Sequence, residues 1–330
     1  MQTKKIINDG NRAVDEMLDG VLAAHPRHLR RVDGSPRSIV AVDGPRPGKV
    51  GIIVGGGSGH EPTFLGFVGK GLADGCAVGN VFASPPPDPI LECAKAVDGG
   101  AGVLFQYGNY AGDVMNFDMA AEMAAMEDIE CRTVLTTDDV ATKDKAKRRG
   151  VAGNFFTFKA GGASADMMKS LDEVERIVRK ANDQTFSMGV ALSPCSLPQT
   201  RTPNFQLGED EMEIGMGIHG EPGIERSALP TADDVAEAMV ERLLADRPEP
   251  GGRVALLVNS LGATPLEELL IVHRATQRCL AEAGVTIAAR YVGHYATSME
   301  MAGCSLSLLD LDPEIERWLA APTTCPFWPR

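Results

Sequence analysis

The spacing of apolar residues along the chain alternates between two patterns. Short apolar runs that are rich in β-branched residues and bounded by glycine are typical of buried strands. Such runs predict strands at residues 50–54, 102–106, 132–136, 253–258 and 285–292. Apolar positions at helical spacing predict helices at residues 11–24, 113–127, 164–181, 231–246 and 265–283. The alternation indicates an α/β protein with mostly parallel or mixed sheets flanked by helices.

Two stretches lack this alternation. Residues 25–49 are rich in arginine, proline and glycine and are expected to form a loop. Residues 184–230 are rich in proline and glycine and poor in helix formers. A chain of 330 residues is longer than a single hydrophobic core usually supports. We therefore expect two α/β domains, residues 1–185 and 186–330, with the crossing between them near residue 185.

Several predicted strands end directly in a polar loop that contains glycine. GGGSGHEP at residues 55–62 follows the first strand, YGNYAGD at 107–113 the second, and NSLGATP at 259–265 the fourth. In open α/β sheets, ligands bind outside the carboxyl ends of the strands. These loops are therefore expected to lie at one edge and to line a shared cleft.

Composition and charge limit the partners of the chain. Hydrophobic residues make up 44% and charged residues 23%, which is typical of a globular protein, and the net charge is -13. Nucleic acids and anionic membranes require a basic face, and the short run KDKAKRR at 143–149 is interpreted as a solvated segment. The chain lacks an apolar run of membrane-spanning length, a signal peptide and CxxC pairs. A cytoplasmic protein with no nucleic-acid or membrane partner is expected.

The glycine-rich loop matches neither common nucleotide motif. A Walker A loop requires G-x-x-x-x-G-K-[ST], and a dinucleotide fingerprint requires G-x-G-x-x-G, whose third glycine would fall on His60. A nicotinamide-dependent oxidoreductase therefore finds no support. Residues 55–59 hold more glycine than a turn needs, so we interpret the loop as a ligand site with Ser58 and His60 at the ligand. A plain strand-to-helix turn is the alternative.

Two of the six histidines share an unusual setting. His60 in GSGHEP and His219 in GIHGEPG each lie beside glycine, with Glu-Pro following closely. Glycine neighbours leave an imidazole approachable, and imidazole can serve as a general base or a nucleophile. The two histidines predict a site between the domains, to which Asp113 adds a carboxylate or serves only as a helix N-cap. The histidine spacing suggests no metal site.

Six motifs in order resemble the substrate-binding subunit of dihydroxyacetone kinase. They are GGGSGHEP, NY-x-GD followed by NF, DDVA at 138–141, RRGVAG at 148–153, MEIGMGIHGEPG at 212–223, and NSLGATP. The resemblance covers essentially the whole chain. It implies two α/β domains, a homodimer and a short-chain ketose substrate.

The resemblance also implies roles for individual residues. The family binds its ketose through a covalent hemiaminal between a histidine nitrogen and the carbonyl carbon, and this histidine corresponds to His219. His60 corresponds to the proton-transfer partner at the carbonyl oxygen. Asp113 corresponds to the base that accepts the proton of the attacking terminal hydroxyl. The substrate loop corresponds to Gly57, Ser58 and Gly59.

The family supplies the phosphoryl group from outside this region. Relatives that use ATP in one chain carry a further helical nucleotide domain, and the present sequence has no nucleotide motif. We therefore expect this chain to bind no cofactor. A separate nucleotide-binding subunit is expected to bring either Mg-ATP or a phosphorylated carrier.

One position departs from the family pattern. Many relatives have a lysine just before NY-x-GD, whereas this chain has Gly108. We hypothesise that the missing side chain makes room for a ketose larger than dihydroxyacetone, such as erythrulose. The alternative function is a non-catalytic relative that binds a ketose and co-regulates transcription. The presence of His60, Asp113 and His219 argues against that alternative.

Overall fold

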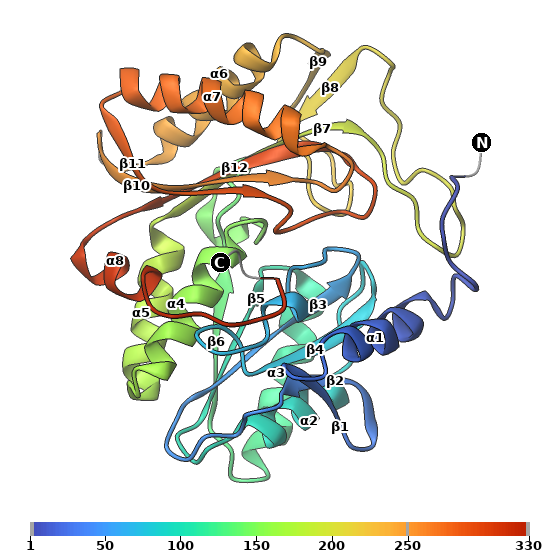
Figure 1. Ribbon diagram of the computed structural model, residues 1–330, viewed down its shortest axis with the longest axis vertical. Helices are drawn as coiled ribbons and strands as arrows, with labels where there is room; N and C mark the ends of the chain where they lie inside the picture. The colour runs from blue at the N-terminus through green and yellow to red at the C-terminus, as the bar shows by residue number, and fades with distance from the viewer. Residues whose placement is uncertain (1–2, 249–250, 328–330) are drawn as a thin grey trace.

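Two six-stranded mixed sheets flanked by helices form the framework of the computed structural model, which describes residues 3–248 and 251–327 (Figure 1). The strand orders are β1-β2-β4-β3-β5-β6 and β11-β10-β12-β7-β8-β9. The first sheet contains β1 (Leu29–Val32), β2 (Ser35–Ala41), β3 (Gly51–Ser58), β4 (Gly75–Val81), β5 (Val103–Gly108) and β6 (Cys131–Thr136). The second contains β7 (Thr185–Ser193), β8 (Glu211–Ile214), β9 (Glu225–Ala228), β10 (Gly252–Ser260), β11 (Val285–Gly293) and β12 (Ala302–Asp310). The α-helices are α1 (Ala13–Ala24), α2 (Pro87–Val97), α3 (Ala111–Ala125), α4 (Asn154–Asp166), α5 (Leu171–Asp183), α6 (Ala232–Asp246), α7 (Leu266–Glu282) and α8 (Pro313–Leu319).

The parallel part of the first sheet positions the glycine-rich loop. β3 pairs in parallel with β4 on one side and β5 on the other, and all eight of its residues are buried. An apolar run without polar alternation fits a strand that is covered on both faces. The antiparallel hairpin of β1 and β2 lies within residues 25–49, so the expectation of a loop there is wrong.

The second sheet is mostly antiparallel. Only the β10–β11 pair is parallel in the described part of this sheet, while β10–β12, β12–β7, β7–β8 and β8–β9 are antiparallel. Three of these strands, β7, β8 and β9, lie in residues 184–230, which were expected to form only a crossing. Their short length and the proline- and glycine-rich loops between them hide the strand pattern in the sequence. The expected two-sheet α/β architecture is confirmed, in its mixed form.

The helix predicted at residues 164–181 covers most of α5 and only the end of α4. α4 ends at Asp166 and α5 begins at Leu171, and Met168 between them has a φ of 57°. Almost all of α4 is buried, so its sequence shows no polar face and no helical period. α5 in contrast packs only one apolar face, and the Ser170 side chain caps its N-terminus by accepting from the Glu173 N–H.

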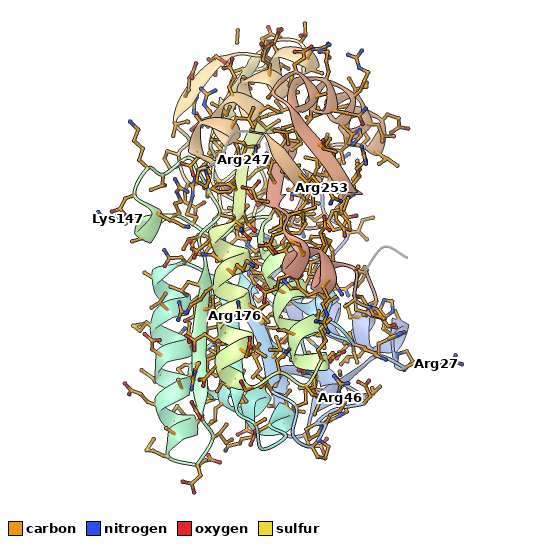
Figure 2. The ribbon with its side chains drawn as sticks, turned by 90° about the vertical axis from the view of Figure 1, so that its left-hand side faces the viewer. Arg27, Arg46, Lys147, Arg176, Arg247 and Arg253 are labelled. Atoms are coloured by element: carbon orange, nitrogen blue, oxygen red, sulfur yellow. The ribbon has the colours of Figure 1, made fainter. Side chains whose placement is uncertain are left out.

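The C-terminal segment returns from the second sheet to the first half of the chain. α8 packs on α4, and Arg176 on the outer face of α5 pairs with Glu314 of α8 at 2.5 Å (Figures 1 and 2). The buried Lys159 ammonium donates to the Ala321 carbonyl at 2.7 Å. These contacts hold the two halves together, and the division near residue 185 stays a prediction.

Candidate active site

His60 is buried in the loop that follows the carboxyl end of β3 in the first sheet. It is 2% exposed, and its Nδ1 lies 2.7 Å from the Thr297 carbonyl oxygen. A carbonyl can only accept, so Nδ1 carries the ring proton and Nε2 carries the lone pair. Nε2 has no hydrogen-bond partner among the described residues. Burial, followed by the charge of nearby His219, lowers the pKa of His60 to about 3, so the ring is neutral at physiological pH.

His219 reaches the same place from the turn between β8 and β9 of the second sheet. The two imidazole centroids are 4.8 Å apart and the rings meet at 74°. Nδ1 of His219 lies 2.8 Å from Glu221 Oε1, and Glu221 Oε2 accepts from the His219 N–H at 2.9 Å. Burial alone would raise the pKa of Glu221, but the hydrogen bonds from His219 lower it to about 2. An ionised Glu221 therefore holds the Nδ1 proton and leaves Nε2 as the nucleophilic nitrogen.

Asp113 lies in the first turn of α3. The N-cap of this helix is Tyr110, so the interpretation of Asp113 as a simple N-cap is wrong. Its Oδ1 is buried and accepts no hydrogen bond from the part of the chain that the structure describes. Burial raises the pKa of Asp113 to about 6, against opposing effects of Ser84 and His219. A carboxylate with this pKa is suited to accept a proton near neutral pH.

Two aromatic side chains form walls around the histidines. Phe82, which follows β4, stacks on His60 at 4.9 Å and 23° and meets His219 edge-on at 5.3 Å. Tyr110 meets His219 edge-on at 4.8 Å and 80°. The buried Tyr110 hydroxyl has no hydrogen-bond partner within residues 3–248 and 251–327. The motif NY-x-GD pointed to Tyr110, whereas no sequence signal pointed to Phe82.

The substrate-loop residues are packed tightly against their neighbours. A Cβ on Gly57 would lie 2.6 Å from the Ala83 nitrogen, and Gly59 has a φ of 98°, so both positions need glycine. The Ser58 hydroxyl donates to the Gly79 carbonyl at 2.8 Å. This hydrogen bond uses the hydroxyl proton within the protein, and Ser58 is only 4% exposed.

Gly108 is the last residue of β5 and lies against Tyr110. A Cβ at position 108 would approach Tyr110 Cε2 to 2.9 Å and the Gly150 carbonyl oxygen to 3.0 Å. The space beside Gly108 is thus taken by the Tyr110 ring. The missing side chain makes room first for a tyrosine of this chain, which in turn contacts His219.

The motifs DDVA and RRGVAG bond to each other, and RRGVAG also bonds to the end of α6. The buried Asp138 carboxylate accepts from the backbone N–H groups that precede α4. Asp139 pairs with Arg149 at 2.6 Å, and Arg148 binds both carboxylate oxygens of Asp246. Arg148 is only 4% exposed, so the interpretation of KDKAKRR as a solvated segment is wrong at its end.

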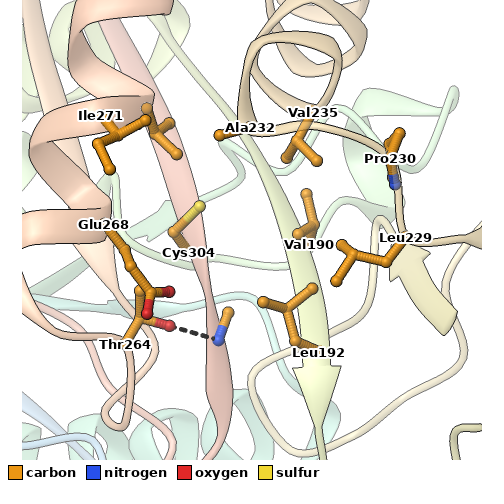
Figure 3. Close-up of a pocket in the computed structure, with 12 residues that line it drawn as sticks. Val190, Leu192, Leu229, Pro230, Ala232, Val235, Thr264, Glu268, Ile271 and Cys304 are labelled. Carbon is orange, nitrogen blue, oxygen red and sulfur yellow. Dashed lines mark hydrogen bonds between the residues drawn. The ribbon is translucent and has the colours of Figure 1, made fainter. Parts of the chain in front are cut away.

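A separate apolar pocket lies on the far side of the second sheet, between α6 and α7 (Figure 3). Its volume is about 190 Å³, and its wall is mainly aliphatic. The side chains that line it include Val190, Leu192, Ala232, Val235, Val272 and Cys304. None of the histidines or carboxylates described above lines this pocket, so it is distinct from the candidate active site.

The structure was also searched for metal sites and membrane spans. Within the described ranges, no group of three or more His, Cys, Asp or Glu side chains could hold a metal ion. None of the helices in these ranges combines the length and the apolar character needed to cross a membrane.

Comparison with known proteins finds similarity over nearly the whole chain. Residues 19–327 match the Dak1 domain. The chain is 46% identical over 327 residues to the PTS-dependent dihydroxyacetone kinase 2, dihydroxyacetone-binding subunit DhaK, of Listeria innocua, covering 98% of this chain and 99% of that protein. It is 44% identical over 328 residues to the D-erythrulose kinase of Mycolicibacterium smegmatis. That match covers 98% of this chain but 56% of the kinase, so the chain spans about half of this longer relative.

Two kinds of solved structure share the fold. The dihydroxyacetone kinase from C. freundii in complex with AMP-PNP and Mg²⁺ matches with a TM-score of 0.92 at 34% identity, covering 99% of this chain and 61% of that chain. The dihydroxyacetone kinase operon co-activator Dha-DhaQ matches with a TM-score of 0.89 at 32% identity, covering 94% of this chain and 97% of that chain. The fold alone therefore does not separate an enzyme from a co-activator.

Proposed function

The chain belongs to the Dak1 domain family, and from this premise we propose that it is the substrate-binding subunit of a short-chain ketose kinase. The observation that carries the proposal is the meeting of His60 and His219, from different domains, with ring centroids 4.8 Å apart. Each ring has one nitrogen held by an acceptor, which leaves the other nitrogen for a ligand. Asp113 adds a carboxylate whose Oδ1 accepts no hydrogen bond from the described residues.

In the proposed first step, Nε2 of His219 attacks the ketone carbon of the substrate. A nitrogen–carbon bond forms, the π bond of the carbonyl breaks, and the ketone oxygen becomes a hydroxyl. Overall, one proton moves from Nδ1 of His219 through Glu221 and solvent water to the ketone oxygen, so the neutral imidazole and the ketone give a neutral hemiaminal and Glu221 is ionised again. The new hydroxyl then donates to the free Nε2 of His60.

Covalent capture suits a small polyol. A short ketose has few apolar atoms from which to gain binding energy, whereas one covalent bond fixes its position and orientation. Well-oriented groups react with effective molarities of about 10⁵ M or more, which lowers the barrier substantially. The bond also selects for a ketone, because alcohols such as glycerol cannot form it.

In the proposed second step, Asp113 accepts the proton of the terminal hydroxyl of the substrate. The oxygen of that hydroxyl attacks the phosphorus atom of the donor. The bond between phosphorus and the donor breaks, and the donor keeps that electron pair. Phosphoryl transfer relies mainly on positioning and charge neutralisation. We propose that a separate nucleotide-binding subunit delivers the donor, as Mg-ATP or as a phosphorylated carrier, and that this chain is a cytoplasmic homodimer.

The proposed substrate is dihydroxyacetone or a four-carbon ketose. Relatives named D-erythrulose kinase and L-erythrulose kinase are 44% and 42% identical to this chain, which supports including erythrulose. Because a Cβ at Gly108 would collide with the Tyr110 ring, we propose that this pair, rather than an empty space, shapes the substrate wall.

The test of the proposed function is turnover with a reconstituted partner. The chain is mixed with a nucleotide-binding subunit and Mg-ATP, or with a phosphorylated carrier, and kcat/KM is measured for dihydroxyacetone, both erythrulose enantiomers and glycerol. We expect phosphorylation of at least one ketose and none of glycerol. Phosphorylation of glycerol, or of none of the four compounds with either donor, would contradict the proposal.

A ketose-binding transcriptional co-activator is the second candidate function. The match to the co-activator Dha-DhaQ over 94% of this chain favours it, since that protein shares the two-domain fold. A co-activator would bind a ketose without turnover, so the same assay separates the two functions. The Asp113 carboxylate has an oxygen that accepts no hydrogen bond from the described residues, and this favours the kinase.

A further inference from the structure

A short segment of the second domain, residues 295–299, holds the loop that carries His60. This interdomain segment follows β11, yet it is bonded to residues 59–63 of the first domain. The hydrogen bonds run from Thr297 N to His60 O (3.2 Å), Met299 N to Gly59 O (2.8 Å), Thr297 Oγ1 to Glu61 O (2.8 Å), Thr63 Oγ1 to Tyr295 O (2.6 Å) and His60 Nδ1 to Thr297 O (2.7 Å). The segment therefore fixes both the backbone and the ring of His60.

The same segment also contacts the turn that carries His219. The Ser298 hydroxyl donates to the carbonyl of Ile218, the residue that precedes His219, and Ser298 is fully buried. The Ser298 N–H donates to the Leu261 carbonyl at 2.7 Å within the second domain. The interdomain segment is thus bonded to the backbone beside both histidines.

The shape of the interdomain segment depends on Asn259 at the end of β10. Asn259 Oδ1 accepts from the N–H groups of Tyr295 at 2.9 Å and Ala296 at 2.8 Å. Its Nδ2 donates to the Ala296 carbonyl at 2.7 Å and to the Ser305 hydroxyl at 3.2 Å. Asn259 is 0% exposed, and an amide has two donor hydrogens and one oxygen with two lone pairs, so every bonding position is used.

We propose that Asn259 is a positioning residue, which shapes segment 295–299 so that the Thr297 carbonyl holds Nδ1 of His60 and leaves Nε2 free for the substrate oxygen. The acceptor at one imidazole nitrogen decides which tautomer a neutral histidine adopts. Asn259 touches neither histidine in the described contacts and acts through the segment alone. This inference rests on the proposed function only in assigning the substrate oxygen to Nε2.

The test is the variant Asn259→Asp in the full-length chain. Aspartate keeps the size and the acceptor oxygen, but it loses the donor and puts a carboxylate oxygen against the Ala296 carbonyl oxygen, which repels it. Nitrogen-15 NMR of the imidazoles at neutral pH then reports the His60 tautomer, and kcat reports catalysis. We expect the His60 signals to move toward a mixture of tautomers and kcat to fall by about tenfold or more.

The matched control is Ser305→Ala. This variant removes only the hydrogen bond from Asn259 Nδ2 to the Ser305 hydroxyl, which joins β10 and β12. The bonds from Asn259 to residues 295 and 296 stay in place. We expect the His60 signals and kcat to stay close to those of the unmodified chain. Equal effects in both variants, or unchanged His60 signals in Asn259→Asp, would overturn the inference.

A second variant covers the case in which Asn259→Asp does not fold. The double variant Thr63→Val and Thr297→Val removes two bonds between the segment and the first domain, while the Thr297 carbonyl remains. We expect the His60 signals to move toward a mixture of tautomers, as in Asn259→Asp. His60 signals equal to those of the unmodified chain would contradict the inference. The NMR measurement needs neither ketose nor phosphoryl donor, so its outcome is separate from the test of the proposed function.

Discussion

At Asp113, folding and chemistry make opposite demands on one carboxyl group. Burial raises the pKa of Asp113 from an ordinary value of 3.8 to about 6. The folded chain therefore holds the proton more tightly than the unfolded chain does. The folded state loses stability as the pH rises from about 4 to about 6, and the full penalty is present above that range. The same shift places the base near neutral pH.

The variant Asp113→Asn is expected to be more stable and inactive. Because asparagine has no charge to desolvate, the free energy of unfolding should rise at pH 8 by on the order of 1 to 3 kcal/mol. The gain should largely vanish at pH 4, where the native carboxyl is protonated. Denaturant unfolding at both pH values measures this difference. Equal gains at the two pH values would show that the carboxyl charge is not the cause.

The pH dependence of turnover should follow the same group. In the unmodified chain kcat is expected to fall as the pH drops below about 6, because protonated Asp113 cannot accept the hydroxyl proton. His60 should not contribute to this fall, since burial lowers its pKa to about 3. A pH–rate profile without a change near pH 6 would contradict the assignment of Asp113 as the base.

Glu221 is expected to control the reactivity of His219. Its carboxylate receives the Nδ1 hydrogen at 2.8 Å, and the variant Glu221→Gln removes the negative charge that favours proton release. We expect formation of the ketose adduct to fall by about tenfold or more, as measured by NMR of the bound ketose. Glu61→Gln is the matched comparison, because Glu61 accepts from the Gly59 N–H at 2.9 Å in the same local pattern but bonds no imidazole. An equally large loss of adduct formation in Glu61→Gln would indicate that the effect comes from the bond to a backbone N–H and not from the bond to the His219 ring.

At the scale of elements, the end of β5 is expected to tolerate no side chain. The variant Gly108→Ala forces a Cβ to within 2.9 Å of the Tyr110 ring, so it should lower the free energy of unfolding by about 1 to 3 kcal/mol and alter the preference between ketoses. Thermal unfolding and kcat/KM for dihydroxyacetone and erythrulose measure the two effects. The control Gly20→Ala on α1 meets nothing within 4 Å and should not lower stability. An unchanged ketose preference in Gly108→Ala would refute the role of the Gly108–Tyr110 pair.

Elements were predictable where burial produces a simple pattern. The runs that became β3, β5 and β10 are continuous and mostly apolar because both faces of each strand are covered. β4 and β12 were missed because glycine and serine interrupt their apolar runs. Most of α4 was missed because a helix buried on all sides has no polar face to mark its period.

The site was predictable only in part for a related reason. Glycine neighbours and the shared Glu-Pro pattern marked His60 and His219, and the same pattern contained Glu221, whose role was not recognised. The roles of Phe82 and Asn259 come from contacts between residues far apart in the chain. Such contacts leave no local periodicity or spacing in a single sequence.

At the scale of the whole molecule, the site exists because the two sheets meet. His60 comes from the first sheet and His219 from the second, and segment 295–299 bonds to the backbone beside both. The buried α4 and the returning C-terminal segment hold the halves in contact. The proposed reaction requires this arrangement, since one domain supplies the nucleophile and the other supplies the base and the partner for the ketone oxygen.

The most direct test of the account is NMR of dihydroxyacetone labelled with carbon-13 at its carbonyl, bound to the unmodified chain and to His219→Ala. If His219 forms the hemiaminal, the bound carbon leaves the ketone region and gives a new resonance of a tetrahedral carbon attached to nitrogen and oxygen. That resonance should be absent with His219→Ala. A bound ketose that keeps its ketone resonance in the unmodified chain, or the same new resonance with His219→Ala, would contradict covalent capture.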